Sequence, residues 1–358
     1  MSVSHEGEYR TRYAAYTRRK VVVTAALALA VIATGVYAVQ AGSAGLTIGE
    51  VVRALSGADG GGPASLIVWN IRMPRVIAAI VAGAGLAIAG AVMQGVLRNP
   101  LASPFTLGIS QGAAFGAALA IIGFGAGMTG TAAADAVRIS NVWSVAGSAF
   151  AGAMVATLAV LAISRTRGAT PETIVLAGVA LGSLFSAGTA LMQYFAEDTQ
   201  VAAVVFWTFG DLGRATWRDV GVMAAAVAGC GAYFLWHRWD YNALETGAES
   251  AHGLGVEVER VRMLGMFVSS LVTAAIVAFL GIIGFIGLVG PHLVRRVMGS
   301  DHRFLLPASA AAGALLLLAA DTLGRTLISP VVLPVGAITS FLGAPLFLYL
   351  LVARRRSA

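Results

Sequence analysis

The chain has 358 residues, of which 58% are hydrophobic and only 11% charged, and its mean hydropathy is +0.82. A soluble domain carries about a quarter charged residues, so the composition excludes an ordinary soluble protein and indicates a polytopic membrane protein. The net charge of +7 does not indicate nucleic-acid binding, because the basic residues stand in short clusters between apolar runs. The single cysteine, Cys230, excludes an intrachain disulfide.

Apolar segments follow one another along the chain with short charged or Pro/Gly-rich turns between them. The first, Val21–Val39, is longer than a signal-peptide core of about 7–15 residues, so we interpret it as a retained helix. The other predicted spans are Val76–Leu97, Pro104–Phe124, Val142–Ser164, Thr173–Phe195, Val220–His237, Met263–Leu280, Phe304–Ala320 and about Ile338–Ala353. One further segment, Ile282–Val294, is shorter than the roughly twenty residues of an ordinary transmembrane helix.

Charge at the two ends decides whether the short segment crosses. The N-terminal tail carries Arg10, Arg12, Arg18, Arg19 and Lys20, and the chain ends with Arg354, Arg355 and Arg356. Because positive segments stay in the cytoplasm, both termini are predicted to be cytoplasmic and the number of crossings even. The short segment is therefore predicted to span, with Pro291 near its inner end; a re-entrant loop is the alternative.

The predicted fold is an all-α integral membrane protein with about ten transmembrane helices. The expected organisation is a cytoplasmic tail (1–20), six helices (21–237), a cytoplasmic loop (238–262), four helices (263–353) and a second tail (354–358). Small residues recur every four positions and predict close helix packing; they are Gly83, Ala87, Ala91 and Gly95, then Gly178, Gly182, Ser186 and Ala190, and also Gly112 and Gly116.

The energy source is constrained by what the spans contain. They are nearly free of charge, whereas gradient-driven carriers usually bury carboxylates or histidines as relays. The exception is Asp321, for which an ion pair with Arg325 is favoured over a proton site. A P-loop needs a lysine beside the phosphates, and the only lysine is Lys20. If ATP drives this protein, a separate subunit must bind it.

Two further motifs have competing interpretations. "GISQG" matches the nucleophile elbow of serine hydrolases, with Ser110 as nucleophile and His292 as an imagined base, but helix packing is favoured because Ser110 lies in an apolar glycine-rich helix. The histidines lack metal-ligand spacing, and no catalytic, cofactor or metal site is predicted. The polar segment from His237 to Arg262 contains glycines that would divide it into two short helices; on composition alone it is a solvated loop.

Four stretches together resemble the FecCD-type permease family. They are "RMPRVIAAIVAGAGLAIAGAVMQGVLRNPLASPFTLGISQGAAFG", "LAGVALG", "GFIGLVGPHLVRRVMGSDHRFLLPASAAAGA" and "LPVGAITSFLGAPLFLYLL". The resemblance covers about Ile71 to Leu351. It implies the fold of a type II ABC importer permease in the prokaryotic cytoplasmic membrane. The implied partners are two ATPase subunits, an extracytoplasmic substrate-binding protein and a second permease chain, identical or related. The implied cargo is a ferric siderophore, with haem and cobalamin as alternatives.

The resemblance also implies roles for particular residues. Arg72, Arg75 and Arg325 would receive acidic residues of the binding protein. The inner gate would include Asn99, Leu101, Thr170 and Pro171, and Thr173–Phe195 and Ile338–Leu351 would line the path. The region that couples to the ATPase would include Asp240, Leu244, Glu245, Glu249, His252, Leu254 and Gly255. The first twenty residues are unmatched and are expected to be disordered.

Overall fold

The computed structural model describes residues 3–42, 45–58, 60–126, 141–165 and 170–355. Within these residues, seven helices are long and apolar enough to cross a membrane. Their ranges are Tyr13–Gln40 of α1 (Val3–Gln40), Pro63–Val96 across α3, η1 and α4 (Pro63–Ile67, Val68–Arg72 and Met73–Val96), α6 (Val142–Arg165), α7 (Pro171–Tyr194), α9 (Trp217–Trp236), α12 (Val258–Leu280) and α14 (His302–Thr326).

Three shorter segments complete the predicted set of spans. One joins η2 (Pro104–Leu107), α5 (Ile109–Ala118) and η3 (Leu119–Gly123); the others are α13 (Ile286–Met298) and α15 (Val335–Arg355). In the described part of the chain these elements match the ten predicted crossings one to one, and the all-α membrane fold is confirmed.

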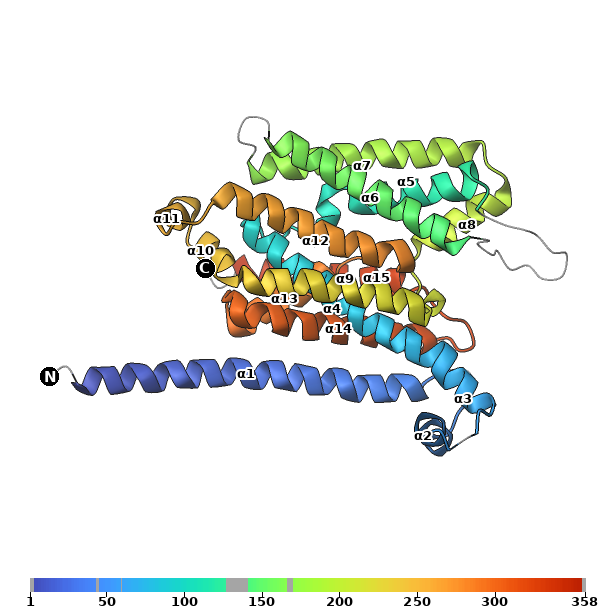
Figure 1. Ribbon diagram of the computed structural model, residues 1–358, viewed down its shortest axis with the longest axis horizontal. Coiled ribbons are helices and arrows are strands. Elements are labelled where there is room, and N and C mark those ends of the chain that lie inside the picture. The colour runs from blue at the N-terminus through green and yellow to red at the C-terminus, as the bar shows by residue number, and fades with distance from the viewer. Residues whose placement is uncertain (1–2, 43–44, 59, 127–140, 166–169, 356–358) are drawn as a thin grey trace.

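The polar helices mark the two ends of the bundle. Figure 1 shows α10 (Arg238–Glu245) and α11 (Ala248–Gly253) at the end where α1 begins and α15 finishes. The short helices α2 (Ile48–Ser56), α3 and α8 (Asp198–Thr208) lie at the opposite end. The two termini therefore share one side of the membrane, which the positive residues identify as the cytoplasmic side.

The doubtful segment crosses the membrane as an incomplete helix. Because α12 ends at the outer face and α14 begins beside the cytoplasmic α10, the chain between them must cross. The helix itself spans Ile286–Met298, and thirteen residues rise only about 20 Å. The outer part of the crossing is non-helical from Gly281 to Phe285, and Phe285 adopts the left-handed conformation (φ 66°). Pro291 lies in the middle of α13, so its predicted place near the inner end was wrong.

Close packing between helix backbones is confirmed for part of the small-residue pattern. A Cβ added to Gly83 would collide with the backbone of Gly313 on α14, and one added to Gly116 with Ser148 on α6. Gly178 likewise meets the backbone of Thr106 in η2. Ser186 and Ala190, at the end of the second predicted repeat, are exposed instead. The repeat on α7 therefore packs only over its first half.

The N-terminal region is more ordered than predicted. Helix α1 begins at Val3, so the expectation of a disordered tail before Val21 was wrong. Lys20 lies inside this long helix and is only 2% exposed; its ammonium is 3.8 Å from the Asp301 carboxylate and stands over the rings of Tyr16 and Phe304. Helix α1 runs along α14, which buries this cation at the cytoplasmic end.

Candidate functional site: two polar clusters at opposite ends of the bundle

Asp321 organises the cluster at the outer end. Its carboxylate is fully buried near the end of α14 and accepts from two arginines. Arg325, one turn later, donates through Nε at 3.0 Å, which confirms the ion pair predicted from their spacing. Arg75 on α4 donates through Nε at 2.9 Å and Nη2 at 2.8 Å. The carboxylate is therefore shared by guanidinium groups from two helices, α4 and α14.

Two of the outer arginines cap the end of α1. Arg72 donates Nη1 to the carbonyls of Val39 and Gln40, both at 2.7 Å. Arg325 donates to Ala41 O at 2.7 Å and Ala38 O at 3.1 Å. The last carbonyls of a helix have no partner within the helix, and cationic side chains there also complement its dipole. These arginines therefore join α1 to α4 and α14.

The predicted docking arginines are accordingly not exposed on the rim. Arg72 is 5% exposed and Arg325 is 7% exposed. Arg75 differs, because it also reaches an outer cavity of about 730 Å³, where its Nη2 lies 3.8 Å from Asp211. Sequence reasoning found the unusual arginines but missed their contacts with α1, because the accepting groups are backbone carbonyls that no side-chain pattern reveals.

The polar segment from His237 to Arg262, which we call the cytoplasmic segment, forms the second cluster and contains both predicted short helices. Gly247, with φ 122°, separates α10 from α11, and Gly255, with φ 84°, follows α11. Glu249, His252, Leu254 and Gly255 are exposed, and Leu254 reaches 71%. Asp240 is partly exposed and bonds to the ring of His237 at 2.7 Å.

Two predicted coupling residues face the protein instead. Leu244 is 1% exposed, and the Glu245 carboxylate accepts from Arg295 on α13 at 2.6 Å. Tyr241, also on α10, is fully buried, and this burial raises the pKa of its phenol. The predicted set therefore divides into an outward-facing group on α11 and the turn after it, and an inward-facing group on α10.

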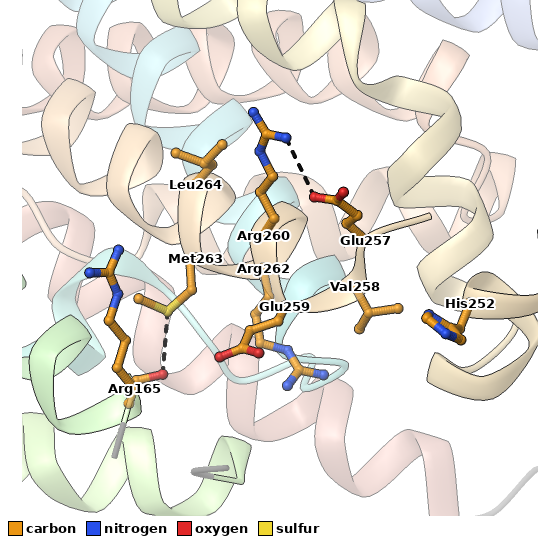
Figure 2. Close-up of a pocket in the computed structure, with 10 residues that line it drawn as sticks. Arg165, His252, Glu257, Val258, Glu259, Arg260, Arg262, Met263 and Leu264 are labelled. Atoms are coloured by element: carbon orange, nitrogen blue, oxygen red, sulfur yellow. Dashed lines mark hydrogen bonds and ion pairs between the residues drawn. The ribbon is translucent and has the colours of Figure 1, made fainter. Parts of the chain in front are cut away.

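A cytoplasmic cavity adjoins the outward-facing group. It has a volume of about 920 Å³ and lies between the end of α6, α11 and the start of α12. Figure 2 shows polar and charged side chains around it, including His252, Glu259 and the ion pair of Glu257 with Arg260 at 3.4 Å. Both signs of charge are present, so the cavity fits a mixed polar surface better than a simple anion.

The predicted gate residues lie in turns at the cytoplasmic end. Asn99 Oδ1 accepts from the backbone N–H of Leu101 at 2.9 Å, and the Leu101 side chain is 42% exposed. Thr170 caps the N-terminus of α7 by accepting from Thr173 N, with Pro171 at the first helical position. The two regions contact each other further along the chain, where Gly178 on α7 meets the backbone of Thr106 in η2.

The hydrolase interpretation is not supported by the geometry around Ser110. Its hydroxyl donates to Gln111 Oε1 at 2.8 Å within α5, and a nucleophile elbow requires a strand-to-helix turn. His292 lies on α13, where its ring faces Phe347 with centroids 6.1 Å apart. Within the described residues, no group of three or more His, Cys, Asp or Glu side chains is arranged to hold a metal.

A tightly packed bundle of long apolar helices with polar clusters at both ends is the architecture of a multi-pass membrane protein. The model of the FecCD transport family matches residues 28–353. The chain belongs to this family and is a prokaryotic cytoplasmic-membrane permease.

Curated relatives cover most of the chain. An ABC transporter permease of Methanocaldococcus jannaschii is 54% identical, over 95% of this chain and 97% of its own. The hemin transport system permease of Yersinia pestis is 39% identical, over 80% of this chain and 84% of its own. The Fe(3+)-citrate import system permease of Bacillus subtilis is 38% identical, over 93% of this chain and 96% of its own.

A solved structure has the same fold. This inward-facing conformation of a metal-chelate type ABC transporter superposes with a TM-score of 0.80 at 29% sequence identity, covering 92% of this chain and 99% of that one. The predicted fold of a type II ABC importer permease is thereby confirmed.

Proposed function

We propose that this chain is the permease subunit of an ATP-driven importer that carries a ferric siderophore across the cytoplasmic membrane. The observation that carries the proposal is the exposed α11 segment, presented at the cytoplasmic end of a bundle whose sequence contains no P-loop lysine. Iron is favoured as cargo because a Bacillus subtilis relative imports Fe(3+)-citrate and the superposed structure is of metal-chelate type. Haem and cobalamin are the alternatives, since relatives transport these too.

Two ATPase subunits are the proposed partners at the cytoplasmic end. Glu249, His252, Leu254 and Gly255 would form the contact surface, because they are exposed and next to a polar cavity. Leu254 is 71% exposed beyond the membrane-spanning part, so its side chain is free to pack against a partner surface. Leu254→Asp should therefore weaken binding of the ATPase while the permease still inserts.

A second permease chain is proposed to complete the pathway. The helices expected to line it, α7 and α15, carry large apolar side chains that this chain alone leaves uncovered. These are Leu176 (68% exposed), Tyr194 (81%) and Phe195 (83%) near α7, and Phe341 (83%) on α15. Asn99, Leu101, Thr170 and Pro171 would close its inner end. ATP-driven movement of the partners would then favour one of two orientations of the path.

An extracytoplasmic binding protein is proposed to dock at the outer end. Among Arg72, Arg75 and Arg325, the first contact with an acidic partner is assigned to Arg75, which reaches the outer cavity. Charge pairing there would set orientation and association rate. Because Arg75 also holds Asp321, docking is best tested by the salt dependence of association, with binding-protein carboxylates substituted instead of the arginine.

The decisive experiment is uptake in proteoliposomes. The permease is reconstituted with its ATPase subunits and binding protein, and uptake of radiolabelled ferric siderophore, haem and cobalamin is measured with and without ATP. ATP-dependent uptake of the siderophore alone supports the proposal. Uptake of haem or cobalamin instead would change the proposed cargo, but the protein would still be the permease of an ATP-driven importer. Accumulation by the permease alone, driven by a pH or sodium gradient, would overturn the ATP-driven mechanism.

A further inference from the structure

The inward-facing side of α10 is held to α13 and α4 by a chain of charge-assisted contacts. Glu245 Oε1 accepts from Arg295 Nη1 at 2.6 Å. The other end of the same guanidinium, Nη2, donates to the Ala91 carbonyl on α4 at 3.2 Å. Both side chains are largely shielded, at 32% and 17% exposure. One arginine fork thus links three helices, and such contacts are stronger and more directional than neutral hydrogen bonds.

A second set of contacts ties α10 to α14 and α1. Asn242 donates Nδ2 to Asp301 Oδ1 at 3.1 Å, and its Oδ1 accepts from the backbone N–H of His302 at 2.7 Å. Asp301 is in turn bound by Arg303 at 2.7 Å and lies 3.8 Å from Lys20 on α1. The amide of Asn242 therefore uses both its donor and its acceptor to hold the start of α14.

The end of the cytoplasmic segment is attached to α4 as well. Arg262, on the first turns of α12, donates Nε to the Val96 carbonyl at 3.2 Å. Val96 is the last residue of α4, immediately before the turn that contains Asn99. The cytoplasmic segment thus contacts α4 from α12, directly, and from α10, through Arg295.

Tight packing leaves little space for α10 to move independently. Tyr241 and Leu244 are buried beneath it. A Cβ added to Gly95 on α4 would stand 3.0 Å from His302 Nε2 and 3.9 Å from Glu245 Oε1. Close-packed interiors transmit displacement instead of absorbing it. A displacement of α10 must therefore displace α4, α13 and α14, or break these contacts.

We propose that Glu245 and Asn242 are positioning residues that transmit movement of the ATPase to α4, the helix that leads into the proposed gate residues Asn99 and Leu101. This inference rests on the proposed function, and it separates the two halves of the cytoplasmic segment. The exposed residues of α11 bind the ATPase, whereas α10 carries the displacement inward. Through Arg295 and Asp301 the force reaches α13, α14 and the last turns of α4.

The test compares transport with ATP hydrolysis in one preparation of the full complex in proteoliposomes. Glu245→Gln keeps the shape of the side chain but removes its charge, and is expected to lower uptake by about tenfold, within the range of energetic coupling between sites. ATP hydrolysis and ATPase binding should each change by less than about twofold. Asn242→Ala should give the same pattern. The exchange Glu245→Arg with Arg295→Glu should recover part of the lost uptake.

Controls separate this inference from the proposed function. Asp198→Asn removes an exposed carboxylate on the opposite face and should leave uptake per ATP unchanged. Wild-type complex that shows no ATP-dependent uptake would defeat the proposed function itself. If Glu245→Gln couples uptake to ATP hydrolysis as well as a functional wild type does, the transmission role is overturned. Parallel loss of uptake, ATP hydrolysis and ATPase binding in this variant would overturn it too.

A second variant covers the case in which Glu245→Gln does not assemble. Arg295→Lys keeps the positive charge but cannot form the same two-ended fork to Glu245 and Ala91. It is expected to assemble and to lose uptake relative to hydrolysis. If this variant takes up as much cargo per ATP hydrolysed as the wild type does, the proposal is contradicted.

Discussion

Arg75 and Asp321 lie 246 positions apart and form a two-point ion pair inside the outer end of the bundle, with Nε and Nη2 donating at 2.9 and 2.8 Å. The Asp321 side chain is completely buried and that of Arg75 is 12% exposed. Because Arg325 shares the same carboxylate, the cluster holds α4 against α14, the helix pair with the most extensive contact.

Asp321→Asn should destabilise the permease severely. The substitution preserves shape but leaves the buried guanidinium of Arg325 without a counter-charge, and Arg75 with only Asp211 at 3.8 Å. Breaking a buried pair costs about 3–5 kcal/mol. The midpoint of thermal unfolding in detergent should fall clearly. Glu257→Gln removes the ion pair with Arg260, whose two side chains are each 71% exposed. It should leave that midpoint almost unchanged. Equal midpoints for both variants would show that the buried cluster is not structural.

Backbone contact between helices gives a second prediction. Gly83→Ala places a methyl group against the backbone of Gly313 on α14, and overpacking of this kind costs about 1–3 kcal/mol. Gly221→Ala on α9 meets no atom within 4 Å, so it should be neutral or stabilise the helix by up to about 1 kcal/mol. Unfolding midpoints of the two variants measure the difference, and a tolerated Gly83→Ala would refute the close approach.

The sequence predicted the spans well because bilayer thickness and the distribution of positive charge act on whole segments. It also predicted the Asp321–Arg325 pair, since residues four apart share a helix face. It did not predict the burial of Arg72, whose partners are the carbonyls of Val39 and Gln40, more than thirty residues away. Carbonyls occur at every residue, so no pattern marks the ones that accept.

The same limit applies at the cytoplasmic end. Glycines predicted two short helices, and α10 and α11 are present. Which face of α10 turns inward depends on Arg295 and Asp301, some fifty to sixty residues further along. Sequence composition favoured a solvated charged loop because it counts Glu245 as an exposed charge. Only the folded arrangement reveals that this carboxylate is held by α13.

Acid should weaken the contacts that Asp301 makes with Asn242 and Arg303. Burial raises the pKa of this carboxyl, but hydrogen bonds from Arg303 and Asn242 outweigh it and hold the pKa at about 2. A pKa below that of the unfolded chain stabilises the fold above about pH 4, and this contribution is lost as the pH falls toward 2. The difference in unfolding midpoint between wild type and Asp301→Asn should thus be constant from about pH 5 to 8 and shrink below about pH 4. A difference that changes between pH 6 and 8 would contradict it.

Capping of α1 can be distinguished from a docking role for Arg72. Arg72→Ala frees the carbonyls of Val39 and Gln40, and a hydrogen bond to a charged group contributes about 1.5–3 kcal/mol. The last turn of α1 should fray, so amide hydrogen exchange in residues 36–42 should accelerate by about tenfold or more. The measurement uses permease without any binding protein, in which a residue needed only for docking has no effect. Arg53→Ala, an exposed arginine on α2, is the matched control and should leave this exchange unchanged. Unaltered exchange in Arg72→Ala, together with slower association of the binding protein, would assign the residue to docking alone.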